Sequence, residues 1–206
     1  PEITADVSDV FNLLTGYSRQ QEFDTLLVAP AGLRTGLLDL IRAQSSPEGQ
    51  ITMKLNSLID PEIIEALYAA SQAGARIELI VRSMCSLRPG VAGLSEGIRV
   101  CSIVGRFLEH SRIYRFGSGA EATYLIGSAD LMQRNLDRRV EVLAPIRDPS
   151  LTARLDEILA ALSADDMLAW ELGEDGSWHR PTATGSINAQ TLLEQAALER
   201  ARRVVA

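Results

Sequence analysis

The sequence predicts an α/β protein in which helices flank a mixed β-sheet. Over the first 82 residues, short apolar runs alternate with helix patterns, which favours parallel strands joined by crossover helices. From residue 98 to residue 146, four strand patterns follow one another with only turns between them, which favours antiparallel pairing. The 206 residues are 46% hydrophobic and 23% charged, as expected for one compact unit or for a domain of a larger protein.

The chain begins with three elements that the apolar pattern predicts. Residues 6–15 have the spacing of an amphipathic helix with four apolar side chains on one face. The apolar run at 24–30 is short enough for a buried strand, and the pattern at 32–44 predicts a helix after it. The four apolar side chains of the first helix are Val7, Val10, Phe11 and Leu14.

Residues 51–58 alternate strictly between apolar and polar side chains. This alternation predicts a strand with Lys54 and Asn56 on its polar side. The next helix has start and stop signals at its ends, and another strand is expected at 75–82. The signals are Asp60 as N-cap, Pro61 at the first helical position and Gly74 just past the end.

The second half of the chain predicts an antiparallel group of strands followed by a helix, a hairpin and a closing helix. Asp148 and Pro149 mark the start of the first of these helices, and the hairpin is expected to turn at "EDG". We therefore expect one domain over 1–165, with 166–206 as a C-terminal appendage of that domain. The four strands are expected at 98–104, 111–116, 122–129 and 139–146.

The stretch "FLEHSRIYRF", residues 107–116, has the alternation of a half-buried strand. On such a strand His110, Arg112 and Tyr114 would share one face. One interpretation is a histidine at a strand end that pairs with a nearby carboxylate, with solvated arginines around it. The other is a reactive site in which a histidine and an arginine act together.

The distribution of charge favours the second interpretation. The net charge of −7 argues against a general nucleic-acid-binding surface, yet six arginines and four acids lie between Cys101 and Val140. Arg82 and Lys54, the only lysine, belong to two other strands. Cations and a histidine that converge at strand ends are typical of a phosphate-handling site. Because the P-loop, the Rossmann glycine fingerprint and the kinase catalytic loop are all missing, such chemistry would depend on side chains.

Other features of the sequence bear on its cysteines and its cellular location. Cys85 and Cys101 lack metal-ligand spacing and are expected to be reduced structural thiols. No apolar run approaches the ~18 residues of a membrane span, and no signal peptide is evident, so we expect a soluble, cytoplasmic protein with no transmembrane segment. His179 is expected at the surface. The start at Pro1 suggests a fragment or a processed product.

Three long stretches resemble the C-terminal catalytic region of bacterial polyphosphate kinase of the first family, which has a phospholipase D-like fold. The first stretch is "FNLLTGYSRQ", the second starts with "KLNSLIDPEIIEALYAASQAG", and the third is "IGSADLMQRNLDRRVEVLAPIRDP". The similarity extends through "FLEHSRIY" to "DGSWHRP", hence through nearly the whole chain.

The resemblance implies reversible transfer of the γ-phosphoryl group of ATP to polyphosphate through a phosphohistidine, with Mg²⁺. It implies that the nucleophilic histidine lies in a preceding homologous domain absent here, and that the magnesium ligands also lie outside this chain. The expected partners are therefore ATP or ADP, polyphosphate and the N-terminal and first catalytic domains of the full-length enzyme. A homo-oligomer and no nucleic acid are also expected, and this chain would be inactive or nearly so by itself.

The resemblance also implies roles for single residues. His110 would be the acid/base or leaving-group partner of the nucleophile. Arg82 and Arg139 would hold phosphates. Weaker expectations are Lys54 and Asn56 as further phosphate or nucleotide ligands and three supporting residues, with no metal ligand among them. The supporting residues are Arg112, Ser128 and Asp130, the last two of which echo the phospholipase D pattern.

Some positions depart from the family pattern, and two other functions remain open. Ser83 stands where glycine is usual, Leu131 where tryptophan is usual, and the stretch before Ile51 is shorter than expected. The first alternative is a non-catalytic polyphosphate-binding module. The second is a phospholipase D-type phosphodiesterase, although that family reads H-x-K where this chain reads H-x-R.

Overall fold

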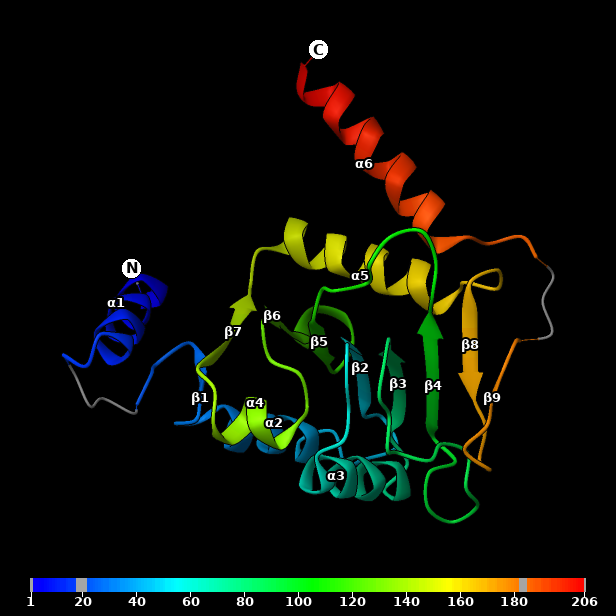
Figure 1. Cartoon of the computed structure of the whole chain (residues 1–206), viewed down its shortest axis with the longest axis horizontal. Coiled ribbons are helices and arrows are strands. Elements are labelled where there is room, and N and C mark those ends of the chain that lie inside the picture. Colours follow the sequence, from blue (N-terminus) through cyan, green and yellow to red (C-terminus); the bar gives the residue numbers. More distant parts are fainter. Residues whose placement is uncertain (1, 18–21, 182–184, 206) are drawn as a thin grey trace.

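The computed structural model describes residues 2–17, 22–181 and 185–205, which form a nine-stranded mixed sheet between two layers of helices (Figure 1). The α/β architecture expected from the sequence is confirmed. The described helices are α1 (Glu2–Leu14), α2 (Leu33–Arg42), α3 (Pro61–Gln72), α4 (Gln133–Asp137), α5 (Pro149–Ser163) and α6 (Ala189–Val205), with a short 3₁₀ turn at Gly119–Glu121. The strands are β1 (Leu27–Ala29), β2 (Gln50–Leu55), β3 (Arg76–Val81), β4 (Ile98–Ile103), β5 (Ile113–Phe116), β6 (Thr123–Gly127), β7 (Glu141–Ile146), β8 (Ala169–Leu172) and β9 (Trp178–His179).

The strands lie in the order β1-β7-β6-β5-β2-β3-β4-β8-β9. The antiparallel pairing of β5, β6 and β7 is confirmed, but two other pairings were predicted wrongly. The strand at 24–30 pairs antiparallel with β7 at the sheet edge, and β7, β6 and β5 lie between it and β2 in the sheet. The strand at 98–104 pairs parallel with β3, because the loop at 82–97 is long enough to cross over without a helix.

Helices cover both faces of the sheet, and successive residues of β3 point to different layers. Leu79 belongs to the larger core, with Leu37 of α2 and Leu67 of α3. Ile80, the next residue, packs in a second core with Leu159 of α5. A strand segment buried on both faces reads as a continuous apolar run, as Leu79, Ile80 and Val81 at the end of β3 do.

The first helix divides the apolar face that the sequence predicts. Val10 is buried, whereas Val7, Phe11 and Leu14 are exposed. The buried side of α1 instead combines Val10 with Asp6, whose carboxylate accepts hydrogen bonds from three backbone N–H groups just before β1. A polar anchor therefore decides how α1 lies on the sheet edge.

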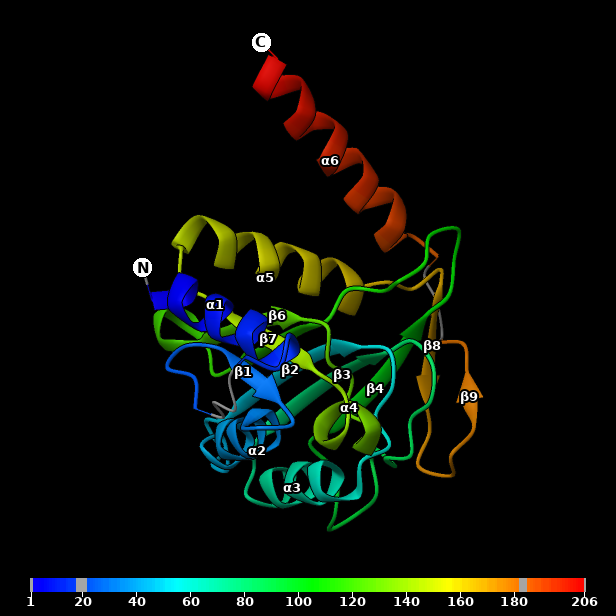
Figure 2. The same cartoon turned by 60° about the vertical axis from the view of Figure 1, so that its left-hand side comes forward.

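The helix signals and the C-terminal elements are confirmed. Asp60 accepts a hydrogen bond from the N–H of Ile63, Asp148 caps α5, and Gly74 has a φ of 102°. β8 and β9 form the expected hairpin, and β8 continues the main sheet beside β4. From this edge α6 projects away from the body (Figure 2). Among the described residues, no helix is long and apolar enough to cross a membrane.

Candidate active site

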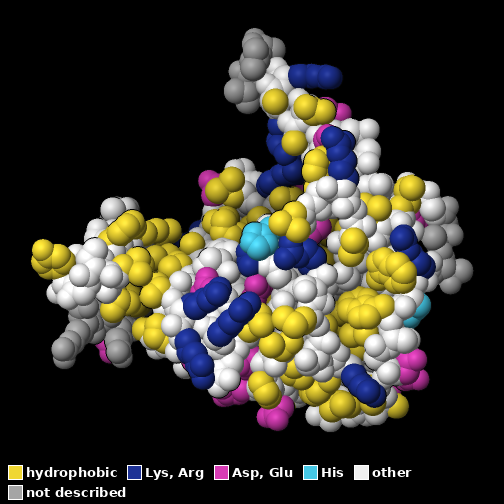
Figure 3. Space-filling model, in the orientation of Figure 1, with side chains coloured by type: hydrophobic (Ala, Val, Ile, Leu, Met, Phe, Trp, Pro, Cys, Tyr) yellow, Lys and Arg dark blue, Asp and Glu magenta, His cyan; other side chains and the backbone are white. Residues whose placement is uncertain are grey.

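A cavity of about 520 Å³ opens where several chain segments meet at one end of the sheet. β2 and β3 end there, β5 begins there, and the loop after β6 leads through it into α4. Figure 3 shows a histidine next to Lys and Arg side chains on this face. The lining residues are Asn56, Ser57, Arg82, Ser83, Met84, His110, Arg112, Ser128, Asp130, Arg134, Asn135, Arg139 and Glu141. All the predicted site residues except Lys54 are among them.

His110 does not lie on a strand, so the predicted strand over 107–116 is wrong in its first half. β5 begins only at Ile113, and His110 is exposed in the segment before it. Tyr114 does not share its face, because this side chain is fully buried and its hydroxyl donates to the carbonyl of Ala129 at 2.8 Å. The chain therefore joins the sheet only at Ile113, after the polar residues of this stretch.

Asp130 is the centre of the hydrogen bonds beneath the cavity. Its carboxylate accepts from the backbone N–H of Asn56 at 2.7 Å and from Nη2 of Arg112 at 3.0 Å. Burial raises the pKa of Asp130, but the hydrogen bonds from Arg112 and Asn56 outweigh burial and hold the pKa below its ordinary value of 3.8. The charge of Arg112 is therefore neutralised, and this side chain also donates to the carbonyl of His110 at 2.8 Å.

Three other arginines leave positive charge in the cavity. In the described part of the chain, no carboxylate lies within ion-pair distance of Arg82, Arg134 or Arg139. Nη1 of Arg82 is buried and has no hydrogen-bond partner there. A buried guanidinium N–H without a partner is costly.

Lys54 lies beneath the segment that carries His110, outside the cavity lining. Its Nζ is 3.3 Å from Oε2 of Glu109 and donates to the carbonyl of Ser111 at 3.1 Å. Burial lowers the pKa of Lys54 from its ordinary value of 10.5, the carboxylate of Glu109 opposes this effect, and the charges of Arg82 and Arg112 add to it.

Arg134 and Glu141 line the cavity but were not predicted from the sequence. Arg134 could have been found from the density of arginines around α4, because it lies in the same stretch as Arg139. Glu141 gave no signal, since its burial and its 2.6 Å hydrogen bond from Nδ2 of Asn135 depend on tertiary packing. Of the two unusual positions, Ser83 lines the cavity and Leu131 is fully buried.

Other reactive groups lie apart from this cavity. His179 is exposed as expected, with Nε2 3.9 Å from Glu171. Both cysteines are free thiols, and burial raises the pKa of Cys85 to about 11 and that of Cys101 to about 12, so neither is a thiolate at neutral pH. No cluster of three or more His, Cys, Asp or Glu that could hold a metal occurs among the described residues.

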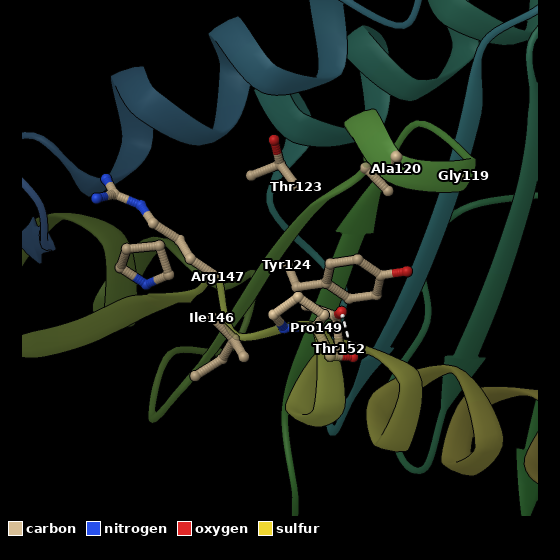
Figure 4. A pocket seen from close by; sticks show the side chains of 10 residues that line it. Gly119, Ala120, Thr123, Tyr124, Ile146, Arg147, Pro149 and Thr152 are labelled. Carbon is tan, nitrogen blue, oxygen red and sulfur yellow. Dashed lines mark hydrogen bonds between the residues drawn. The ribbon is translucent and has the colours of Figure 1, made fainter.

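A second hollow, of about 480 Å³, lies at the opposite end of β5 and β6. Figure 4 shows Thr123, Tyr124, Arg147 and Thr152 around it, next to the start of α5. The hydroxyl of Tyr124 donates to Asp156 at 2.8 Å. None of the predicted site residues lines this hollow, so the chemistry expected from the sequence belongs to the first cavity.

Comparisons with known proteins agree with this architecture. A family model described as "Polyphosphate kinase C-terminal domain 2" matches residues 26–190. The polyphosphate kinase of Mycobacterium avium (strain 104) is 52% identical over 183 residues, which cover 86% of this chain and 25% of that protein. The chain thus spans about a quarter of the length of the curated relatives that it matches.

Solved structures give the same result. The polyphosphate kinase from Porphyromonas gingivalis matches with a TM-score of 0.90 and 32% identity over 97% of this chain and 32% of that chain. Nuc from Salmonella typhimurium, a phospholipase D family member, matches with a TM-score of 0.53 and 18% identity over 76% of this chain and 97% of that chain, a likeness of fold alone. The phospholipase D-like fold is therefore confirmed, and the chain belongs to the polyphosphate kinase C-terminal domain 2 family.

Proposed function

We propose that this chain forms one wall of the active site of a polyphosphate kinase, which reversibly transfers the γ-phosphoryl group of ATP to the end of a polyphosphate chain. The observation that carries the proposal is the cavity in which exposed His110 lies beside arginines without carboxylate partners. Arginine binds phosphate oxygens through a planar fork of N–H groups, and its charge stabilises a phosphoryl group in transfer.

In this proposal the nucleophilic histidine belongs to another domain of the longer protein. Its nitrogen displaces ADP from the γ-phosphorus of ATP, and a terminal polyphosphate oxygen later displaces that nitrogen. His110 gives or accepts the proton that the departing or entering group requires. Arg82, Arg134 and Arg139 bind the phosphate oxygens, and Asn56 assists from the end of β2.

Magnesium is part of the proposal, but the described residues do not fit a magnesium site of their own. Asp130 is engaged by Arg112 and Asn56, and Glu141 accepts from Asn135. Mg²⁺ prefers several free oxygen ligands and usually binds with substrate phosphates. We therefore propose that the ion arrives on ATP or ADP, with any protein ligands on other domains.

The test uses the full-length polyphosphate kinase that contains this domain, with γ-labelled ATP and Mg²⁺. We expect acid-labile label on the other catalytic domain together with polymer formation, and we expect His110→Ala to abolish most turnover while the protein stays folded. Label on this chain alone would make His110 the nucleophile. Polyphosphate binding without turnover in the wild-type protein would instead identify a binding module.

The proposal extends to partners and location. The remaining domains of the longer protein and a second copy of it are the proposed protein partners, supported by apolar side chains exposed on α1, namely Ile3, Val7, Phe11 and Leu14. The cytoplasm is the proposed location, supported by the two free thiols. Light scattering of the full-length protein tests the oligomer, and cell fractionation tests the location.

A further inference from the structure

The segment that carries His110 has little support from the sheet. Residues 104–112 lie between β4 and β5, outside both strands, and Val104, Phe107 and Leu108 are exposed. A segment of this kind is mobile unless other contacts hold it. Its position therefore depends on the groups that bind its backbone and the carboxylate of Glu109, the only acid in the segment.

Gln190 binds this segment from α6. The side chain is 4% exposed, and its Oε1 accepts from the N–H of Phe107 at 2.9 Å while Nε2 donates to the carbonyl of the same residue at 2.8 Å. Nε2 also donates to Oε1 of Glu109 at 3.0 Å. The backbone of Phe107 fixes the orientation of the amide, because the N–H of that residue requires an acceptor.

Glu109 links Gln190 to a second anchor on β2. Its other carboxylate oxygen, Oε2, is 3.3 Å from Nζ of Lys54. Nζ also donates to the carbonyl of Ser111 at 3.1 Å, so the residues on both sides of His110 are held. Buried polar networks whose members are all hydrogen-bonded rigidify their surroundings.

We infer that Gln190, Glu109 and Lys54 are positioning residues that hold His110 at the cavity for phosphoryl transfer. The inference rests on the proposed function, and none of the three residues lines the cavity itself. A misplacement of about 1 Å at a reacting group can cost 10²-fold in rate, so such a support matters for catalysis.

The place of Gln190 is itself fixed by the chain between β8 and α6. The N–H of Ala189, the residue before it, donates to Oδ2 of Asp165 at 2.7 Å, and Asp165 also accepts from the N–H of Ala169 at the start of β8. Figures 1 and 2 both show the segment after β4 running beside the base of α6. The C-terminal hairpin and helix thereby take part in building the site.

The test compares Gln190→Glu with Gln195→Ala, a matched control because Gln195 is exposed on the same helix. Gln190→Glu keeps the side-chain shape but replaces the Nε2 donor with an acceptor beside Glu109. In the full-length enzyme we expect kcat to fall about tenfold to a hundredfold. We expect the KM for ATP to stay close to that of the control. The unfolding midpoint should fall, because the new carboxylate is buried beside Glu109, so the rates are compared well below that midpoint. An unchanged kcat would overturn the inference.

Two further measurements separate this inference from the proposed function. NMR of the His110 ring in the 206-residue chain needs no activity, and we expect its signals to shift or broaden in Gln190→Glu but not in Gln195→Ala. Unchanged signals would overturn the inference even in an active enzyme, and shifted signals in an enzyme without phosphotransferase activity would defeat only the proposed function.

In the double variant Glu109→Gln/Gln190→Glu a donor and an acceptor face each other again, so part of the kcat lost in Gln190→Glu should return.

Discussion

Asp130 shows how one residue connects several parts of the cavity wall. Its carboxylate joins the end of β2, through Asn56, to Arg112 in front of β5. Because Arg112 is neutralised, the positive charge of the cavity is left to the arginines without partners. The position of a single buried acid thus separates the paired Arg112 from the unpaired arginines of the cavity.

Asp130→Asn should lower the free energy of unfolding by about 3 kcal/mol at neutral pH, because Arg112 would lose its buried partner. The pKa of Asp130 is below 3.8 in the folded protein, so the unfolded chain takes up its proton first as the pH falls. The contribution is complete above that value and is lost as the pH falls through the folded pKa. Urea unfolding at several pH values should therefore show the difference between wild type and variant shrinking in acid. A constant difference would contradict the assignment.

Arg82→Lys and Arg139→Lys test the phosphate ligands. Lysine keeps the charge but lacks the planar fork, so we expect a rate loss of about 10²-fold in the full-length enzyme with the fold retained. Arg42→Lys is the control, since Arg42 is exposed on α2 away from the cavity. Steady-state phosphotransfer measures the rate, and circular dichroism measures the fold. Wild-type rates in both variants would exclude the guanidinium groups of Arg82 and Arg139 as phosphate ligands.

At the scale of elements, Arg34 connects three helices. From α2 its guanidinium forms two hydrogen bonds of 2.8 Å to Asp60, the N-cap of α3, and two of 2.8 Å to Asp137 at the end of α4. α4 is only five residues long; it carries Arg134, and Arg139 lies two residues after its end. This doubly bidentate contact therefore holds the short helix that carries Arg134 and precedes Arg139.

Arg34→Lys should weaken this contact, because an ammonium group cannot form two forked pairs at once. We expect the free energy of unfolding to fall by about 1–3 kcal/mol, since Asp60 is buried and would lose hydrogen bonds. Amide exchange in α4 should quicken more than exchange in β3. Equal changes in both elements would point to a general loss of stability instead.

The sequence predicted elements better than it predicted their neighbours. The helices and strands are local patterns, and the caps at Asp60 and Asp148 are signals within four residues. The partners of β1 and β4 depend on where the chain crosses the sheet, which no local pattern encodes. His110 and the arginines could be found from their charge and from the family resemblance, whereas Gln190 could not, because it contacts residues 83 positions away.

At the scale of the whole molecule, the two edges of the sheet are held differently. At one edge β8 pairs with β4 and is followed by α6, which reaches the site through Gln190. At the other edge α1 is attached through a small cluster of Val10, Leu26 and Val28 and through Asp6. Most of its other apolar side chains are exposed, so this helix has the weakest attachment to the body.

Asp6→Asn should release α1 selectively. The carboxylate accepts three backbone hydrogen bonds, which outweigh the effect of burial and hold its pKa below 3.8, and an amide oxygen accepts them less strongly. Hydrogen exchange should show faster exchange in α1 with β2 and β3 unchanged. Uniform protection across the chain would show that the apolar cluster alone holds the helix.

The single lysine of the chain has a consequence for chemical labelling. Lys54 is 1% exposed and its ammonium group is paired with the carboxylate of Glu109, so an amine-selective reagent applied to the native protein should spare this side chain. Modification at Lys54 then requires Glu109 and its segment to move away from the side chain. The rate of Lys54 modification, measured by mass spectrometry of the peptide that contains it, would report how often the segment beside His110 separates from the sheet.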